Sequence, residues 1–314
     1  MSDKCLYCYQ PLRDGERDFH QRCSSRIFGT AEAPRLPYTH ADINELATQV
    51  VRARSSVTGV QPKLSVDFDR MSNRPDRLTI VGLWGQFILK PQTDNYPHLP
   101  ELEDVCMHLA QVAGINTVPH SLIRFADGEL CYITRRIDRT GTGRKLPMED
   151  MCQLSMLMTE DKYHSSHERI AKLIDKYSSV PRLDIIRYWA QVLFSWVIGN
   201  ADMHLKNYSI YSKDDKEFTL APAYDLLSTA IVLPSDNEEL ALTVSGRKRK
   251  LTRLNFTQAM TASGIIPKVQ TNIINRLTRS VSAWRAIISQ SFLPETMRLQ
   301  LTAIINDRMA RLAD

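Results

Sequence analysis

The spacing of apolar residues divides the chain into two parts with different periods. Residues 64–68 and 78–81 alternate between apolar and polar side chains, and residues 84–89, 121–125 and 130–135 form further short apolar runs. Alternation of this kind is typical of half-buried strands. Helical spacing is seen over 42–52, where Asp42 is the expected N-cap, and over 101–113. The pattern therefore predicts a small antiparallel sheet with helices beside it.

After Met148 the period becomes helical. Residues 182–198 place Ile186, Trp189, Leu193 and Val197 on one face, and residues 255–313 predict two or three closing helices. The runs 208–211 and 218–220 predict a hairpin between them. We expect an α+β fold with three parts, a short segment over 1–29, a β-rich lobe over 30–140 and a helical lobe over 141–314. A ligand site is expected between two such lobes.

Composition is that of an ordinary globular protein. The 314 residues are 43% apolar and 24% charged, with 40 basic against 35 acidic residues and a net charge of +5. This mild excess permits an acidic partner without requiring a nucleic acid. The longest strongly apolar stretch, around 192–198, is far shorter than a membrane span, and the first residues carry no apolar signal region. We therefore expect a cytoplasmic protein without membrane contact, although export to another cell needs no visible leader.

Three of the six cysteines lie in the first 23 residues. Cys5 and Cys8 are separated by two residues, as are His20 and Cys23. Two close pairs of sulfur and imidazole ligands match the spacing of a structural zinc site, which needs four ligands. The alternative is three incidental cysteines with a surface histidine. We favour zinc, and expect the metal to supply much of the stability of so short a knuckle.

The strongest group of polar residues lies in 199–207, with the sequence GNADMHLKN. Asp202 and Asn207 are five residues apart, and Asp225 follows eighteen residues later. Phosphoryl transfer requires a carboxylate that orients the acceptor, oxygen ligands for Mg²⁺ and a cation on the phosphates. Protein kinases use the same Asp-to-Asn spacing. The alternative is a polar turn between a helix and a strand, which also favours Asn and Asp.

A lysine at the end of an apolar strand is the second candidate. Lys90 closes the run FILK, and Glu103 lies thirteen residues further, in the next predicted helix. Kinases pair such a lysine with a helix glutamate to hold ATP phosphates. The alternative is a strand-end surface charge and an acid favoured by the helix dipole. The loop 55–63, with Ser56, Val57, Thr58 and Gly59, fits neither common phosphate-loop motif.

Together these segments resemble the HipA family of bacterial serine/threonine kinases, the toxins of HipBA-type toxin–antitoxin systems. The resemblance covers roughly residues 50–230 and is looser toward the C-terminus. It is carried by six motifs in family order: SVTGVQPK at 56–63, FILKP at 87–91, RRIDR at 135–139, EDMCQ at 149–153, GNADMHLKN at 199–207 and AYD at 223–225. It implies a two-lobed, protein-kinase-like fold.

The resemblance also implies roles for individual residues. Asp202 would be the catalytic base, and Asn207 and Asp225 would bind Mg²⁺. The remaining positions would meet ATP: Lys90 paired with Glu103, His204, the loop Ser56, Val57, Thr58 and Gly59, and the adenine-binding stretch with Thr134, Arg135 and Ile137. Ser56 occupies the family's autophosphorylated position, and Thr58 a second one. Phosphate there adds negative charge beside the nucleotide, which implies self-inactivation.

The family resemblance implies partners as well. Long members carry an extra N-terminal subdomain of about a hundred residues, whereas this loop begins at Ser55. In this respect the chain is similar to the short HipT-like members, some of which are encoded with a separate small protein that resembles the missing subdomain. The implied substrate class is an aminoacyl-tRNA synthetase or another translation protein. A cognate antitoxin would be a further partner, with DNA reached only through that antitoxin.

Two other functions are compatible with the sequence. The zinc knuckle and the basic run at 246–250, with the sequence GRKRK, are compatible with a nucleic-acid or protein binding module whose kinase core is inert. Such runs are more often solvated loops. A kinase of small molecules or lipids on a related fold would use the same phosphate chemistry. The family resemblance favours the protein kinase.

Overall fold

The computed structural model describes residues 3–43, 45, 62–69, 74–81 and 84–313. The predicted loop residues Ser56 to Gly59 lie outside these ranges. The chain forms two compact units. The first comprises Met1–Asp104, Val118–Arg144 and Gln290–Phe292, and the second comprises Val105–Thr117, Lys145–Ser289 and Leu293–Asp314. Helix α3 (Leu99–Val112) begins in the first unit and ends in the second.

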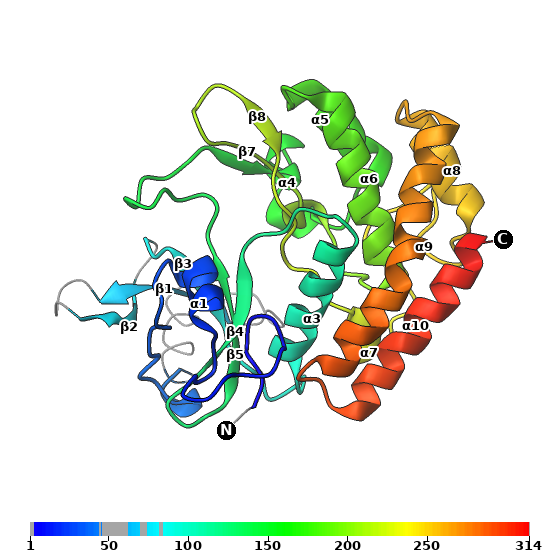
Figure 1. Cartoon of the computed structure of the whole chain (residues 1–314). Helices are drawn as coiled ribbons and strands as arrows, with labels where there is room; N and C mark the ends of the chain where they lie inside the picture. Colours follow the sequence, from blue (N-terminus) through cyan, green and yellow to red (C-terminus); the bar gives the residue numbers. More distant parts are fainter. Residues whose placement is uncertain (1–2, 44, 46–61, 70–73, 82–83, 314) are drawn as a thin grey trace. The chain divides into compact units, whose positions relative to one another are not determined.

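The first unit is built on a five-stranded antiparallel sheet in the order β2-β1-β3-β5-β4 (Figure 1). Its strands are β1 (Leu64–Asp69), β2 (Arg74–Ile80), β3 (Phe87–Lys90), β4 (His120–Arg124) and β5 (Leu130–Arg135). The predicted strands are thus confirmed, with small shifts at their ends. Helix α1 (Gln21–Phe28) belongs to the same unit.

Apolar side chains of the N-terminal segment and of the sheet share one core. Cys5, Leu6 and Ile27 are buried in the same cluster as Val66 and Leu89. The rings of Phe28 and Phe87 lie 5.9 Å apart between centroids. Residues 3–28 therefore pack as part of the first unit, which is consistent with a segment too short to bury its own core.

Two details of the first unit differ from the sequence-based expectation. The helix predicted from Asp42 begins at His40, and its cap is Thr39, because the backbone amide of Asp42 donates to Thr39 Oγ1 and that of Thr39 donates to the Asp42 carboxylate. The proline-containing stretch 30–40 is also more than a spacer. The backbone amide of Arg35 donates to the backbone oxygen of Asp76, and that of Leu78 donates to the backbone oxygen of Arg35. These bonds attach the stretch to the edge strand β2.

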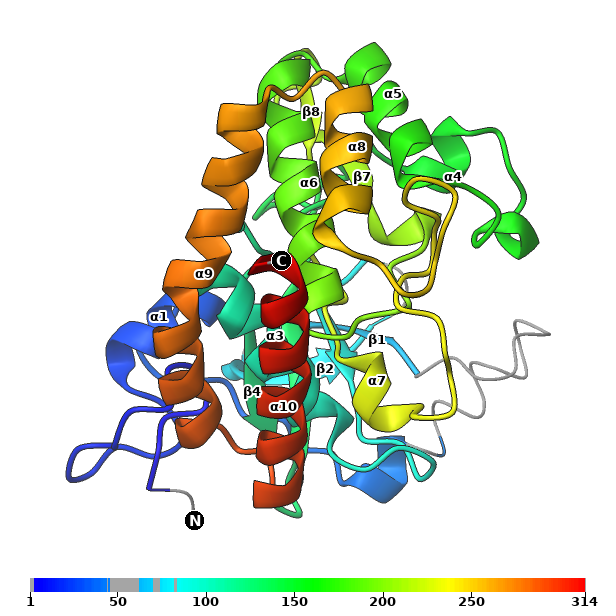
Figure 2. The same ribbon diagram turned by 90° about the vertical axis from the view of Figure 1, so that its right-hand side faces the viewer.

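The second unit is mostly helical, as predicted. Its longer helices are α5 (His167–Tyr177), α6 (Pro181–Val197), α8 (Arg253–Ala262), α9 (Pro267–Gln290) and α10 (Glu295–Ala313), with short helices α4 (Met151–Leu154) and α7 (Thr229–Val232) and 3₁₀ turns η1 (Thr159–Asp161) and η2 (Leu205–Asn207). Helix α10 runs beside α9 in both views (Figures 1 and 2), and Arg285 donates to Asn306 between them. Trp284 of α9 packs edge-on against Phe194 of the buried helix α6.

The predicted hairpin is present, with a third strand that the pattern did not reveal. Strands β7 (Ser209–Ser212) and β8 (Phe218–Leu220) pair antiparallel, and β6 (Met148–Asp150) pairs with the other edge of β7. The loop between α6 and β7 contains η2 and is therefore held between a buried helix and a paired strand. No helix in the described part of the chain is long and apolar enough to cross a membrane.

Candidate active site

The loop between α6 and β7 is closed by hydrogen bonds among its own residues. The amide Nδ2 of Asn207 donates to the backbone oxygen of Asp202 over 3.0 Å, and the backbone amide of Asp202 donates to Asn200 Oδ1 over 3.1 Å. Asn207 is buried, whereas Asp202 is exposed. These bonds fix the backbone of the loop that carries the exposed Asp202 carboxylate. Because the Asn207 amide nitrogen already donates a hydrogen bond, Oδ1 is the atom of Asn207 suited to a metal.

Gly199 makes the loop's approach to its neighbours possible. Its φ is +74°, and an added Cβ would lie 3.0 Å from the Ala230 side chain and 3.1 Å from that of Ile304. A larger residue would therefore be both strained and crowded here. The backbone amide of Ala201 donates to Thr229 Oγ1, which anchors the next residues of the loop to α7.

Asp225 is connected to the same loop through its backbone. Asn200 Nδ2 donates to the backbone oxygen of Asp225 over 3.4 Å, and Asp225 has a positive φ of 57°. A left-handed conformation at a non-glycine residue is uncommon, and such residues cluster at functional sites. The chain at Asp225 is thus tied through its backbone to the loop that carries Asp202 and Asn207.

His204 lies in the same loop with its ring buried. Its Nδ1 has no hydrogen-bond partner among the described residues. Burial lowers the pKa of His204, although the nearby Asp202 carboxylate acts in the opposite direction. A buried, neutral ring nitrogen without a partner is suited to meeting a polar ligand. This observation favours a ligand-binding loop over a simple polar turn.

Tyr163 is a contact of Asp202 that the sequence did not reveal. Its hydroxyl donates to Asp202 Oδ1 over 2.6 Å, and its ring packs edge-on against His204 at 5.1 Å between centroids. Burial, and then this hydrogen bond to a carboxylate, raises the pKa of Tyr163. Tyr163 thus orients the predicted base. Its separation of 39 residues from Asp202 left no pattern by which it could be found.

The motif at 149–153 supports the loop from the β6 side. Asp150 caps α4 in a capping box with Gln153, and its second carboxylate oxygen accepts a 2.8 Å ion pair from Lys206. Tyr224 donates to the backbone oxygen of Lys206 and bonds Ser209. The motifs 149–153, 199–207 and 223–225 therefore converge in the second unit.

The predicted lysine–glutamate pair forms in the first unit. Lys90 Nζ lies 2.5 Å from Glu103 Oε1, and both side chains are almost fully buried, with 6% and 4% of their surface exposed. Lys90 ends β3, and Glu103 lies in the second turn of α3. The Tyr132 ring on β5 lies 5.3 Å from the ammonium. A buried charge needs a partner, and this one has both a carboxylate and an aromatic face.

The stretch predicted to meet adenine lies at the end of β5, the strand between β3 and the edge strand β4. Thr134 is buried and donates to Pro119 O, while Arg135 closes the strand and Ile137 lies just beyond it. Beyond the strand, the Asp138 carboxylate forms ion pairs with Arg136 and Arg139. Burial alone would raise the pKa of Asp138, but these two cations lower it.

The four N-terminal ligands come together as predicted from their spacing. The candidate ligand atoms of Cys5, Cys8, His20 and Cys23 all lie within 4.8 Å of one another. His20 Nδ1 is 3.4 Å from Cys8 Sγ and 3.7 Å from Cys23 Sγ. A tetrahedral zinc site has an N–S edge of about 3.6 Å, from Zn–S and Zn–N bonds of about 2.3 and 2.1 Å. We refer to residues 5–23 as the knuckle.

The surroundings of the knuckle also suit a metal. His20 Nε2 donates to Pro11 O over 2.9 Å, which leaves the Nδ1 lone pair directed at the sulfur atoms. Burial raises the pKa of Cys8. Burial, with coulombic interactions with Cys5 and Cys8, raises the pKa of Cys23 to about 12. A cation among these thiols would stabilise the thiolates and displace their protons. All six cysteines are free of disulfide bonds.

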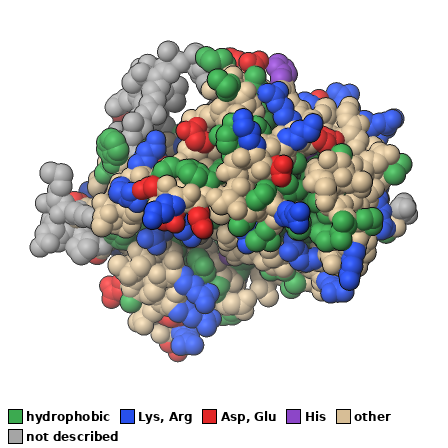
Figure 3. Space-filling view, turned by 90° about the horizontal axis from the view of Figure 1, so that it is seen from above, with side chains coloured by type: hydrophobic (Ala, Val, Ile, Leu, Met, Phe, Trp, Pro, Cys, Tyr) green, Lys and Arg blue, Asp and Glu red, His purple; other side chains and the backbone are tan. Residues whose placement is uncertain are grey.

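The basic run at 246–250 has the features of a solvated loop. Lys248 Nζ forms a 3.1 Å ion pair with Glu238, and Val244 and Arg247 close a tight turn through their backbones. On the face seen in Figure 3, Lys and Arg side chains of the described residues are interspersed with acidic and apolar ones. The ion pair and the turn agree with the solvated loop that was the alternative for this run.

Sequence comparison agrees with the motifs assembled above. The model of the family described as HipA-like C-terminal domain matches residues 55–284. The chain belongs to this HipA-like family. The match includes Lys90, Glu103, Asp202, Asn207 and Asp225, and leaves out the knuckle.

Individual HipA-like relatives are distant. The candidate kinase Y4mE of Sinorhizobium fredii is 29% identical over 226 residues, which cover 68% of this chain and 53% of the relative. The serine/threonine-protein kinase toxin HipA of Shewanella oneidensis is 28% identical over 199 residues, which cover 56% of this chain and 44% of the toxin. The chain thus matches about half the length of these two relatives.

Solved structures support the HipA-type fold. HipA of Shewanella oneidensis, in a complex with HipB and operator DNA, matches with a TM-score of 0.67 at 22% identity, over 82% of this chain and 64% of that one. The proinflammatory kinase CtkA of Helicobacter pylori matches with a TM-score of 0.53 at 13% identity, over 76% and 91% of the two chains. The predicted α+β kinase-like fold, with a β-rich and a helical part, is confirmed.

Proposed function

We propose that this HipA-like chain is an ATP- and Mg²⁺-dependent serine/threonine protein kinase. The observation that carries the proposal is the hydrogen bond from Asn207 to the backbone of Asp202. It fixes a carboxylate and an amide oxygen in one loop, at the spacing of a base and a metal ligand. Membership of the HipA-like family and the buried Lys90–Glu103 pair support the same chemistry.

The proposed reaction is direct transfer of the γ-phosphoryl group. Asp202 accepts the proton of a substrate serine or threonine hydroxyl, and the hydroxyl oxygen bonds to the γ-phosphorus. The bond between the γ-phosphorus and the β–γ bridging oxygen breaks, which releases ADP. Asn207 and Asp225 would hold Mg²⁺, whose charge would offset that of the phosphates. Lys90, oriented by Glu103, contributes a fixed positive charge to the phosphates, and His204 meets them with a neutral ring.

The biological role proposed is that of a toxin of a toxin–antitoxin system. It rests on the similarity to the HipA toxin of Shewanella oneidensis and on the solved complex of that protein with HipB and DNA. The proposed substrate is an aminoacyl-tRNA synthetase or another translation protein. Phosphorylation of Ser56 or Thr58 would inactivate the kinase, because it adds charge beside the bound nucleotide.

The knuckle is proposed to bind one structural Zn²⁺. Its support is a set of three sulfur atoms and one imidazole nitrogen that all lie within 4.8 Å of one another. The nitrogen lies 3.4 Å from Cys8 Sγ and 3.7 Å from Cys23 Sγ, close to the N–S edge of a tetrahedral site, and four ligands leave no position for substrate. Closed four-ligand sites of this kind stabilise folds and take no part in chemistry.

The proposed function is tested by phosphate transfer from γ-labelled ATP and Mg²⁺, with the protein alone and with a bacterial lysate. Wild type should label itself and one lysate protein. Asp202→Ala should lower transfer by about 10²–10⁴-fold while ATP affinity is kept, since Asp202 is exposed and its loss leaves the loop intact. Asp175→Ala, an exposed acid on α5, is the matched control and should keep full transfer.

Two results would contradict the proposal. Full transfer by Asp202→Ala would remove this residue from the chemistry. Label in a small product, with none in protein, would assign the chain to small-molecule or lipid kinases instead.

A further inference from the structure

Tyr9 connects the knuckle to the helix that carries Glu103. It directly follows the candidate ligand Cys8 and is 3% exposed. Its φ is +62°, a left-handed conformation that is strained for a tyrosine. The backbone amide of Tyr9 donates to Cys5 O, which closes the turn between the first two ligands. The conformation of that turn therefore sets where the Tyr9 side chain points.

The Tyr9 hydroxyl ends in a buried polar network on α3. It donates to Asp104 Oδ2 over 2.5 Å, and the other oxygen of Asp104 lies 2.8 Å from Nδ1 of His120 on β4. The side chains of Asp104 and His120 have no exposed surface. Hydrogen bonds to a buried carboxylate are among the stronger ones in proteins. Loss of the hydroxyl would leave one of these oxygens without that donor.

The same network reaches the candidate nucleotide lysine by two routes. Asp104 directly follows Glu103, so a bond that fixes Asp104 also fixes the turn of α3 that presents Glu103 to Lys90. The His120 ring stacks on Tyr132 at 6.0 Å and 20°, and Tyr132 lies against the Lys90 ammonium. Lys90 and Tyr132 face each other in the β3–β5 register. Knuckle, helix and sheet thus form one closed set of contacts within the first unit.

We propose that metal binding at the knuckle positions the Lys90–Glu103 pair through Tyr9, and so controls the affinity for ATP. With Zn²⁺ bound, the Cys5–Cys8 turn is fixed, Tyr9 holds Asp104, and α3 presents Glu103 to Lys90. Without the metal the turn loosens, the hydroxyl leaves Asp104 and the pair loses its fixed geometry. Tyr9 is a positioning residue in this scheme. The inference rests on the proposed function, because it takes Lys90 as a ligand of the nucleotide.

The test compares full-length wild type, Tyr9→Phe and Tyr38→Phe. Tyr38 supplies a matched control, since it lies in the same unit and its hydroxyl bonds the edge strand β2 through Thr79 and Ile80. Metal binding is followed by the thiolate absorption of substituted Co²⁺. ATP affinity is measured with excess Mg²⁺, before and after a zinc-selective chelator. Amide hydrogen exchange of α3 is measured without nucleotide.

The expected result is a selective loss in Tyr9→Phe. It should bind one Co²⁺ with the wild-type spectrum but bind ATP about fivefold to tenfold more weakly. Chelation should weaken wild type and Tyr38→Phe by a similar factor, and should add little to Tyr9→Phe. Exchange in α3 should be faster in Tyr9→Phe and in chelated wild type.

Several outcomes would overturn the inference. Wild-type ATP affinity in Tyr9→Phe would do so, as would chelation that weakens wild type and Tyr9→Phe by the same factor. Absence of Co²⁺–thiolate absorption in wild type would remove the metal site itself. Failure of the proposed function is distinguishable, because metal-loaded wild type would then bind no ATP while exchange in α3 still responded to Tyr9→Phe.

Discussion

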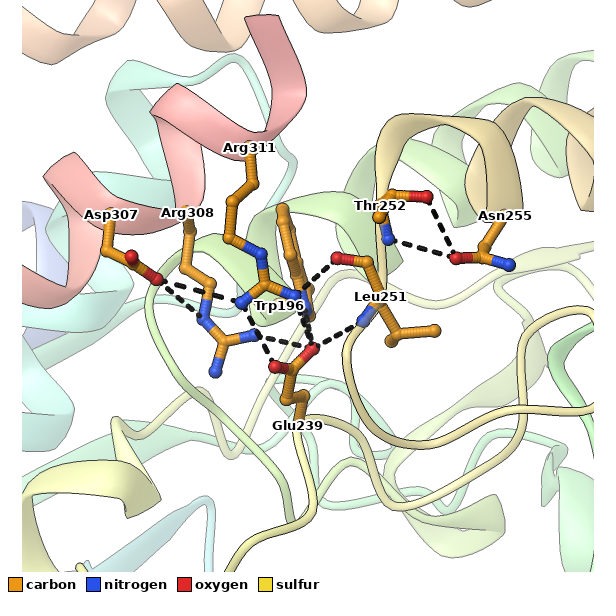
Figure 4. A network of polar contacts seen from close by, with 8 residues as sticks. All are labelled: Trp196, Glu239, Leu251, Thr252, Asn255, Asp307, Arg308 and Arg311. Carbon is orange, nitrogen blue, oxygen red and sulfur yellow. Dashed lines mark hydrogen bonds and ion pairs between the residues drawn. The ribbon is translucent and has the colours of Figure 1, made fainter. Parts of the chain in front are cut away.

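Each unit contains one group of buried or partly buried charged side chains. The first unit has the Lys90–Glu103 pair, and the second has a cluster of several donors around Glu239. The Glu239 carboxylate accepts hydrogen bonds from Trp196 Nε1 and from the backbone amide of Leu251 (Figure 4). It also accepts two hydrogen bonds from the Arg311 guanidinium and lies 2.7 Å from that of Arg308. Both guanidinium groups lie 5.0 Å from the Trp196 ring. This Glu239 cluster ties α10 to α6 and to the chain at Leu251.

The two groups differ in what they gain from their charges. In the Glu239 cluster one carboxylate is shared by several donors, and the Arg311 side chain remains 27% exposed. Lys90 and Glu103 are 6% and 4% exposed, so both charges lose nearly all of their hydration. Replacing such a buried pair by apolar residues is often neutral or stabilising. We infer that the Glu239 cluster serves the fold, and that Lys90–Glu103 is kept for a ligand.

The largest effect is expected when both members of the buried pair are replaced. Lys90→Met with Glu103→Met should leave the free energy of unfolding within about 1 kcal/mol of wild type or raise it. ATP affinity and phosphate transfer should fall by about 10²-fold or more, because a fixed charge on the phosphates is lost. Denaturant unfolding and nucleotide titration measure the two quantities. A stable double variant with wild-type ATP affinity would contradict a role of the pair in nucleotide binding.

The converse is expected for Glu239→Gln. Two guanidinium groups lose their nearer counter-charge and keep only Asp307, which lies 4.0 Å from Arg308 and 3.7 Å from Arg311. The free energy of unfolding should therefore fall by about 2–4 kcal/mol. ATP affinity should stay at the wild-type value. Burial alone would raise the pKa of Glu239, but hydrogen bonds from Arg311, Trp196 and Leu251 and the charge of Arg308 lower it to about 2.

This pKa defines a pH window. A carboxyl whose folded pKa lies below its unfolded value of 4.5 contributes stability above pH 4.5 and loses it as pH falls toward 2. Wild type should therefore lose on the order of 2 kcal/mol from this group over that range, after allowance for solvent screening. Glu239→Gln should lack this component. Parallel stability curves for the two proteins over pH 2–4.5 would argue against the assignment.

The smallest effect is expected for Arg311→Lys. The charge remains, but the paired hydrogen bond to Glu239 and the planar contact with Trp196 are lost. We expect a loss of about 1 kcal/mol in the free energy of unfolding and unchanged ATP affinity. A change as large as that of Glu239→Gln would show that net charge is less important here than geometry.

Local periodicity predicted most of the elements because each was long enough to show its pattern. The alternating runs gave the strands of the first sheet, and residues 182–198 predicted the buried helix α6. Strand β6 was missed, since three residues that pair with β7 show no period. The cap at Thr39 was missed because Asp42 is also a residue suited to capping.

Sites were predictable where their residues lie close together in the sequence. Cys5, Cys8, His20 and Cys23 meet as their spacing suggested, and Asp202 and Asn207 share one loop. Contacts that depend on distant segments left no local signal. Tyr9 meets Asp104 across 95 residues, and Glu239 meets Arg311 across 72. The catalytic and nucleotide roles of the site residues remain predictions.

The most direct test is to map phosphate in the protein after incubation with Mg²⁺ and ATP, by mass spectrometry of the peptide with Ser56 and Thr58. Four proteins are treated in parallel, after checking that none is already modified. They are wild type, Asp202→Ala, Glu239→Gln and the double variant with Lys90→Met and Glu103→Met. Wild type and Glu239→Gln should gain phosphate on this peptide, and the other two should not. Unmodified wild type, or equal modification of all four proteins, would contradict the account.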